Sequence, residues 1–110
     1  MKTYVVLYHA PQEVAARFAQ ATAEEAQAGL AQWQEWSAGL GDRLVDLGRP
    51  LGAAATVTAA GCVDGGSDVI GMSVVRAQSR DEALELVREH HHLAWGSITL
   101  LEEQVVPELA

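Results

Sequence analysis

Runs of β-branched and aromatic residues mark the expected strands of this chain. Residues 3–9, "TYVVLYH", stop just before Pro11 and predict a first strand. Residues 69–77, "VIGMSVVRA", show the clearest strand pattern, and residues 97–106 predict a last strand that ends at Pro107. These segments indicate a sheet whose strands are separated by longer, more polar stretches.

The middle of the chain mixes strand-forming and turn-forming residues. Residues 43–52, "RLVDLGRPLG", lead into a strand that glycine and proline interrupt, and residues 53–63 could continue it. The stretch 64–68, "DGGSD", is a strong turn signal. We therefore expect residues 53–63, the turn 64–68 and residues 69–77 to form an antiparallel hairpin.

Apolar residues spaced four apart and capping signals predict the first two helices. Val14 and Phe18 follow Pro11, which suits the first turn of a helix, and predict a short helix. Thr22 and Glu25 form a capping box that begins a second helix.

The second helix presents an apolar face that carries tryptophan. Its apolar face runs through Ala26, Leu30, Trp33, Ser37 and Leu40, with Trp36 on the flank. Gly39 and Gly41 end this helix. We interpret both tryptophans as core residues, and stacking on a ligand is the alternative.

A third helix begins at a second capping box, made by Ser79 and Glu82. Its pattern continues through "RDEALELVREHHH", residues 80–92, with Val87 and His91 on the apolar stripe. We therefore expect the three consecutive histidines at the C-terminal end of this helix.

The element order is β-α-β-β-α-β, with the first helical stretch in two parts. This is the order of a ferredoxin-like α+β sandwich, in which helices cover one face of a four-stranded antiparallel sheet. Residues 1–110 then form a single domain, with no linker or low-complexity tract.

Both faces of the expected sheet are apolar. The two faces of the first strand carry, in turn, Tyr4, Val6, Tyr8 and Val5, Leu7, His9. A sheet with one wet face should instead alternate apolar and polar residues. Burying such a face is worth on the order of 10 kcal/mol before the cost of association. We therefore expect a homodimer whose sheets pack face to face as a dimeric α+β barrel.

The composition favours a soluble globular protein with an acidic surface. Of the 110 residues 49% are hydrophobic, and the net charge is −8. Such a surface repels phosphate backbones and anionic headgroups, so we expect neither nucleic acid nor a membrane as partner. The sequence has neither a membrane-span pattern nor a signal-peptide pattern, which predicts a cytoplasmic protein. Cys62 is the one cysteine and cannot form an internal disulfide.

Three of the four histidines are consecutive, in "EHHHL", and admit three interpretations. At a helix C-terminus, a protonated histidine is stabilised by the dipole and its pKa rises. Alternatively, His90 or His92 is a general base oriented by Asp42 or Asp46 of "GDRLVDLG". A metal site would need a further ligand such as His9, and residues two apart diverge on a helix, so we expect no metal.

A second candidate site lies at the end of the first strand. His9 is placed there as a pocket residue, with Tyr8 and Trp95 as possible walls, or else as a rim residue with a satisfied hydrogen bond. Arg49 could bind a substrate carboxylate or solvate a turn. The glycines form neither a phosphate-binding loop nor a dinucleotide fingerprint, so we expect no cofactor.

The order of these segments resembles the YCII-related family over nearly the whole chain. The resemblance rests on "GDRLVDLG", on the S-x-D-E-A pattern, and on an acidic-His-x-His-Leu run that His90 and His92 match. One branch of the family carries Asp-Gly-Pro-Phe in the hairpin. Residues 64–67 are Asp-Gly-Gly-Ser here, so that signature is absent.

The resemblance implies a dimeric α+β barrel and, as in some members, a His–Asp pair in a cleft. Relatives in the wider superfamily catalyse lyase or isomerase chemistry on small aromatic or lactone substrates. We therefore expect a small enzyme of lyase or isomerase type, and the alternative is a non-catalytic dimeric ligand-binding or accessory protein.

Overall fold

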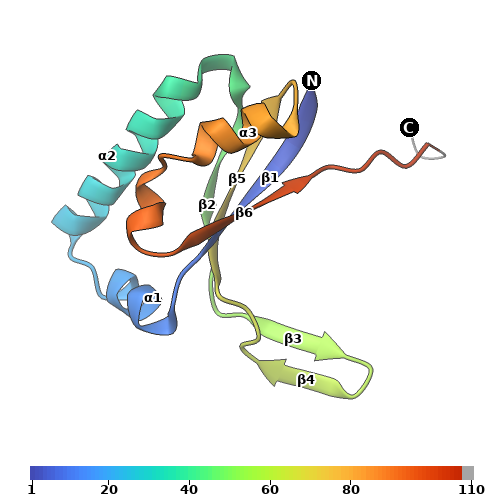
Figure 1. Cartoon of the computed structure of the whole chain (residues 1–110). Coiled ribbons are helices and arrows are strands. Elements are labelled where there is room, and N and C mark those ends of the chain that lie inside the picture. Colours follow the sequence, from blue (N-terminus) through green and yellow to red (C-terminus); the bar gives the residue numbers. More distant parts are fainter. Residues whose placement is uncertain (108–110) are drawn as a thin grey trace.

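The computed structural model describes residues 1–107 (Figure 1). The elements, in chain order, are β1 (Lys2–His9), α1 (Gln12–Ala19), α2 (Ala23–Leu40), the 3₁₀ turn η1 (Gly41–Arg43), β2 (Leu44–Pro50), β3 (Ala55–Thr58), β4 (Gly61–Asp64), β5 (Val69–Ala77), α3 (Arg80–Val87), the 3₁₀ turn η2 (His91–Ala94) and β6 (Ser97–Glu102). Within this part of the chain, no helix is long and apolar enough to cross a membrane.

Strands β2, β5, β1 and β6 form, in that order, an antiparallel sheet. The fold is therefore α+β and compatible with a ferredoxin-like sandwich. Residues of α2 and α3 join the same core cluster as the buried side of β1, so both helices cover one face of the sheet (Figure 1). The Cα extents are 42 × 39 × 19 Å. The short axis corresponds to one layer of helices on one sheet.

The core lies between these two layers. Side chains on β1 alternate, so that Tyr4, Val6 and Tyr8 are buried against the helices. The remaining buried apolar members of the core cluster are Leu40, Val75, Ala77, Ala83 and Val87. On the opposite side of the sheet, Val5 and Leu7 are half-buried without helical cover. We call this opposite side the open face.

Residues 53–63 neither continue β2 nor form a hairpin with residues 69–77, contrary to the sequence prediction. Strands β3 and β4 pair only with each other within the described chain, from Ala55 with Asp64 to Thr58 with Gly61. They form an arm that extends away from the main sheet (Figure 1). The reason is local. A two-residue turn joins β3 to β4, and positive φ values at Gly65 and Gly66 redirect the chain into β5.

The capping residues place both helix starts as predicted, although the capping box is complete only at α2. At α2, the backbone N–H of Glu25 donates to the Thr22 hydroxyl and that of Thr22 donates to the Glu25 carboxylate, both at 3.1 Å. At α3, the backbone N–H of Glu82 donates to the Ser79 hydroxyl at 3.2 Å. These bonds satisfy N–H groups that the first turn of a helix leaves unpaired.

Two predicted element ends are wrong. Helix α3 ends at Val87 and does not reach residue 92. His90 has extended backbone angles, and its ring accepts the His92 N–H and so starts η2 instead. Strand β6 ends at Glu102, not at 106. The N–H of Glu103 still donates to the Thr3 carbonyl at 2.8 Å, and the chain beyond it extends away from the sheet (Figure 1).

Candidate active site at the end of strand β1

His9 is the last residue of β1 and faces the open side of the sheet. It follows the buried Tyr8, and the alternation of the strand turns it away from the helices. On one side it is paired with Ser97 of β6, and on the other with Val69 of β5 after a register shift. His9 therefore lies between β6 and the loop that enters β5.

Both ring nitrogens of His9 are held by side chains. Nδ1 lies 2.7 Å from Oδ1 of Asp68, and Nε2 lies 2.7 Å from the hydroxyl oxygen of Thr99. A carboxylate only accepts hydrogen bonds, so in the neutral ring Nδ1 carries the proton. Nε2 then presents its lone pair, to which the Thr99 hydroxyl donates.

The electrostatics of this group favour an ionised carboxylate beside the imidazole. The hydrogen bond from His9 lowers the pKa of Asp68, against a smaller opposing effect of burial. The Asp68 side chain is 66% exposed and that of His9 is 20% exposed. The site is therefore open to solvent on the Asp68 side and sheltered around the imidazole.

Backbone contacts fix the position of His9. The N–H of Ala10 donates to the carbonyl of Asp68 at 3.0 Å, which ties the end of β1 to the loop before β5. Nε2 of His92 lies 2.7 Å from the His9 carbonyl and donates to it. Gly96 passes so close that any side chain there would collide with the same carbonyl oxygen.

His90 and His92 are buried and hydrogen-bond to the backbone, a role that the sequence did not reveal. His90 is 2% exposed, and its Nδ1 accepts the backbone N–H of His92 at 3.0 Å. Its Nε2 is buried and has no hydrogen-bond partner within the described residues. The ring packs among Tyr8, Trp33 and Trp36, with centroids 4.5–5.0 Å away. The two tryptophans are half-buried and pack against the core, in line with the interpretation from the sequence.

Burial is the main cause that lowers the pKa of His90 to about 3, and the neighbouring histidines add to it. Burial also lowers the pKa of His91. The expected rise at a helix C-terminus is absent for these two rings, because α3 ends before them. His90 is consequently a neutral ring at physiological pH.

The structure does not bring His90 or His92 together with the predicted aspartates. Asp46 accepts from the backbone N–H of Gly48 at 2.8 Å and pairs with Arg49 at 3.0 Å. Asp42 is exposed in η1. The hydrogen bonds of His90 and His92 within residues 1–107 involve no carboxylate.

The other predicted pocket residues are dispersed. Tyr8 points to the helix side of the sheet, away from His9, and its hydroxyl donates to Ser73 at 2.9 Å. Trp95 is exposed and packs edge-on against Phe18. Arg49 is engaged with Asp46 on β2, as described above. Of the predicted site residues, only His9 contributes its side chain to the hydrogen-bonded group of Asp68, His9 and Thr99.

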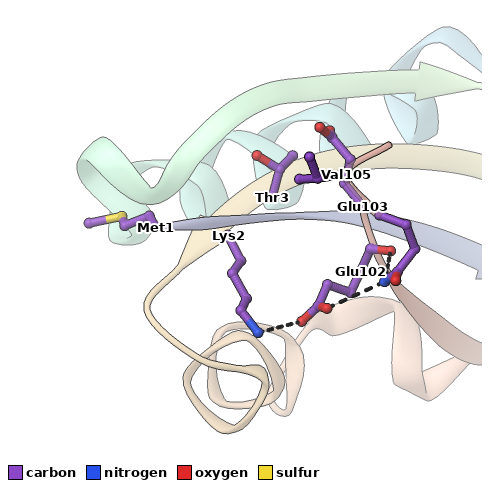
Figure 2. Close-up of a pocket in the computed structure, with 7 residues that line it drawn as sticks. Met1, Lys2, Thr3, Glu102, Glu103 and Val105 are labelled. Atoms are coloured by element: carbon purple, nitrogen blue, oxygen red, sulfur yellow. Dashed lines mark hydrogen bonds and ion pairs between the residues drawn. The ribbon is translucent and has the colours of Figure 1, made fainter. Parts of the chain in front are cut away.

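Two surface hollows lie apart from His9. One, of about 260 Å³, is lined by Met1, Lys2, Thr3, Glu102, Glu103, Gln104 and Val105. Figure 2 shows the ion pair of Lys2 with Glu102 there, at 3.3 Å. The other, of about 300 Å³, is lined by Leu84, Val87, Arg88, Leu93, Ile98 and Leu100. Among the described residues, no group of three or more His, Cys, Asp and Glu side chains is arranged to hold a metal.

Sequence reasoning missed Asp68 and Thr99, although a signal for Asp68 was present. Asp68 directly precedes the clearest predicted strand, and antiparallel neighbours bring the end of one strand beside the start of the next. The sequence could therefore have paired His9 with Asp68 once β1 and β5 were placed side by side.

Comparison with family models and with curated protein sequences finds no match.

Proposed function

We propose that this protein is a small acid–base enzyme of lyase or isomerase type, with His9 as the group that moves the proton. One observation carries the proposal: Oδ1 of Asp68 lies 2.7 Å from Nδ1 of His9, on the open face of the sheet. A carboxylate in that position selects the tautomer with a free lone pair on Nε2 and stabilises the imidazolium.

The reaction needs only these two groups and a substrate with an acidic C–H bond. Nε2 of His9 takes the proton from carbon, after the substrate displaces the Thr99 hydroxyl that occupies the lone pair. The imidazolium then returns the proton to a neighbouring atom of the substrate. Positioned acid–base catalysis of this kind contributes roughly 10²–10⁴-fold to a rate. The YCII resemblance supports a small aromatic or lactone-like substrate.

A second copy of the chain would enclose the site. The open face beside His9 carries half-buried or exposed apolar side chains, namely Val5, Leu7, Met72, Val74 and Leu101. A contiguous apolar patch of this kind is typical of an interaction surface. We therefore propose a two-fold dimer, a dimeric α+β barrel, in which this face meets its copy.

The alternative is a dimeric protein that binds a small ligand or acts as an accessory without catalysis. It is favoured by one observation: neither of the two hollows described above includes His9. The two proposals differ in whether the imidazole exchanges a proton with a bound molecule.

The exchange of carbon-bound protons of a small test substrate with solvent tests the proposal, and it does not require the natural substrate to be known. We expect the protein to accelerate hydrogen–deuterium exchange at the acidic C–H of small unsaturated lactones, followed by NMR in D₂O. His9→Gln and Asp68→Asn should each lower this rate by about 10²-fold or more. Asp42→Asn, at an exposed carboxylate outside the site, is the matched control and should exchange at the wild-type rate. Equal rates in wild type and His9→Gln would refute the enzyme proposal.

A further inference from the structure

We propose that Thr99 is a nucleophile, and that Asp68, His9 and Thr99 together accept an acyl group from a small ester or lactone. This inference rests on His9 acting as the base of the proposed function. It adds a covalent step to a site that otherwise only moves protons.

The geometry is that of an activated hydroxyl. The hydroxyl oxygen of Thr99 lies 2.7 Å from Nε2 of His9, and Asp68 lies 2.7 Å from Nδ1 on the other side of the ring. A hydroxyl within hydrogen-bond reach of a base, which is itself oriented by a third group, is the general arrangement of a nucleophile, its base and an orienting acid. The order of contacts is carboxylate, imidazole, hydroxyl.

Thr99 is also accessible. It is exposed on β6, next to Leu7 of β1, which in turn pairs with Met72 of β5. These two apolar side chains share the face of Thr99. In the proposed dimer they would line the barrel interior beside Thr99, where they would provide a floor for an apolar acyl group. Ser97 lies two residues from Thr99 on the same face, opposite His9. Ser97 is exposed, and in this proposal its hydroxyl would donate to the carbonyl oxygen of the ester.

Transfer of the acyl group from the ester to Thr99 requires no oxidant or reductant. The Thr99 hydroxyl oxygen attacks the ester carbonyl and forms a C–O bond, while its proton moves to Nε2 of His9. The tetrahedral intermediate collapses, the bond to the leaving alkoxide or phenoxide breaks, and the imidazolium protonates that leaving group. Water, deprotonated by the same imidazole, then releases the acid and restores the threonine. For a lactone, the leaving oxygen stays attached to the acyl chain.

The test uses 4-nitrophenyl acetate as an acyl donor and the full-length protein. We expect release of nitrophenolate, with the acetyl group located on Thr99 by peptide mapping and mass spectrometry. Thr99→Val, which removes the hydroxyl and keeps the shape, should lower the acylation rate by about 10²-fold or more, and Thr99→Ser should retain acylation. Thr3→Val, another threonine on the open face of the sheet, is the matched control and should react as wild type.

The outcomes separate this inference from the proposed function. Wild-type protein that reacts no faster than Thr99→Val, or acetyl found on His9 or Lys2 and not on Thr99, overturns the nucleophile. If Thr99→Val loses acylation but keeps His9-dependent exchange on lactones, both the nucleophile and the base stand. Loss of exchange in His9→Gln together with unchanged acylation would refute the nucleophile alone. Circular dichroism of each variant checks that the fold is retained.

Discussion

His90 shows how burial can override a polar residue's usual behaviour. Its Nδ1 serves the backbone of η2, and its Nε2–H lies among aromatic rings without a hydrogen-bond partner in residues 1–107. A buried, unpaired donor costs about 1–3 kcal/mol, and packing of the ring against Trp33 and Trp36 acts against this cost. Protonating this ring would add a buried charge to that cost.

The first consequence is a dependence of stability on pH. The folded pKa of His90 is about 3, below the unfolded value of 6.5, so the unfolded chain binds a proton that the folded chain does not. The free energy of unfolding should therefore fall as the pH drops below 6.5, by up to about 1.4 kcal/mol per pH unit. Urea unfolding between about pH 5 and pH 7, where carboxylates stay ionised, measures this slope.

His90→Leu identifies the group responsible. The leucine variant lacks the titrating ring, so its stability should change less with pH over the same interval. It also lacks the acceptor for the His92 N–H and should be less stable at neutral pH, but the measured quantity is the slope. Identical slopes in wild type and variant would show that His90 does not control the pH dependence.

At the scale of elements, the helices depend unequally on packing. Within the described chain, α1 contributes no buried residue, and the one fully buried residue of α2 is Leu40 at its C-terminal end. The N-terminal half of α2 is exposed. Its start must therefore depend on local interactions, chiefly the capping box of Thr22 and Glu25.

Loss of this cap should be measurable as loss of stability. Thr22→Ala removes the hydroxyl that accepts the Glu25 N–H, and we expect it to lower the free energy of unfolding by about 1 kcal/mol. Thr22→Ser keeps the hydroxyl and should behave almost as wild type. Chemical denaturation followed by circular dichroism measures both. A Thr22→Ala protein as stable as Thr22→Ser would mean that the start of α2 is held by other contacts.

Local patterns predicted these element starts because they act within a few residues. Strands β1 and β5 follow from their β-branched runs, and α2 and α3 start at their capping residues. Element ends and the arm were mispredicted for the opposite reason. The end of α3 depends on a ring that folds back on η2, and β3–β4 pair with each other although their sequence also suits the main sheet.

At the scale of the whole molecule, the open face is an apolar surface that no helix of this chain covers. The helices cover one side of the sheet, and apolar side chains on β1 and β5 remain on the other. Covering several hundred Å² would contribute on the order of 10 kcal/mol, from which the cost of association, about 4–15 kcal/mol, must be subtracted.

Sedimentation equilibrium tests the dimer directly. We expect a dimer at micromolar concentration, and Val74→Lys on the open face of β5 should convert it to a monomer by burying an unpaired charge. Val57→Lys, on the exposed arm, is the matched control and should remain dimeric. A wild-type monomer at micromolar concentration would refute the interface.

The sequence by itself determined the α+β class, the principal strands and the capped helix starts, because each depends on near neighbours and on the periodicity of burial. It also pointed to His9 as a site candidate. Only the tertiary structure decided which carboxylate meets that ring. Asp68 and Thr99 are 59 and 90 residues away from His9, and they converge because β1 lies between β5 and β6. The "EHHHL" run suggested catalytic histidines. In the tertiary structure His90 is instead buried among aromatic rings, and this burial keeps its ring neutral.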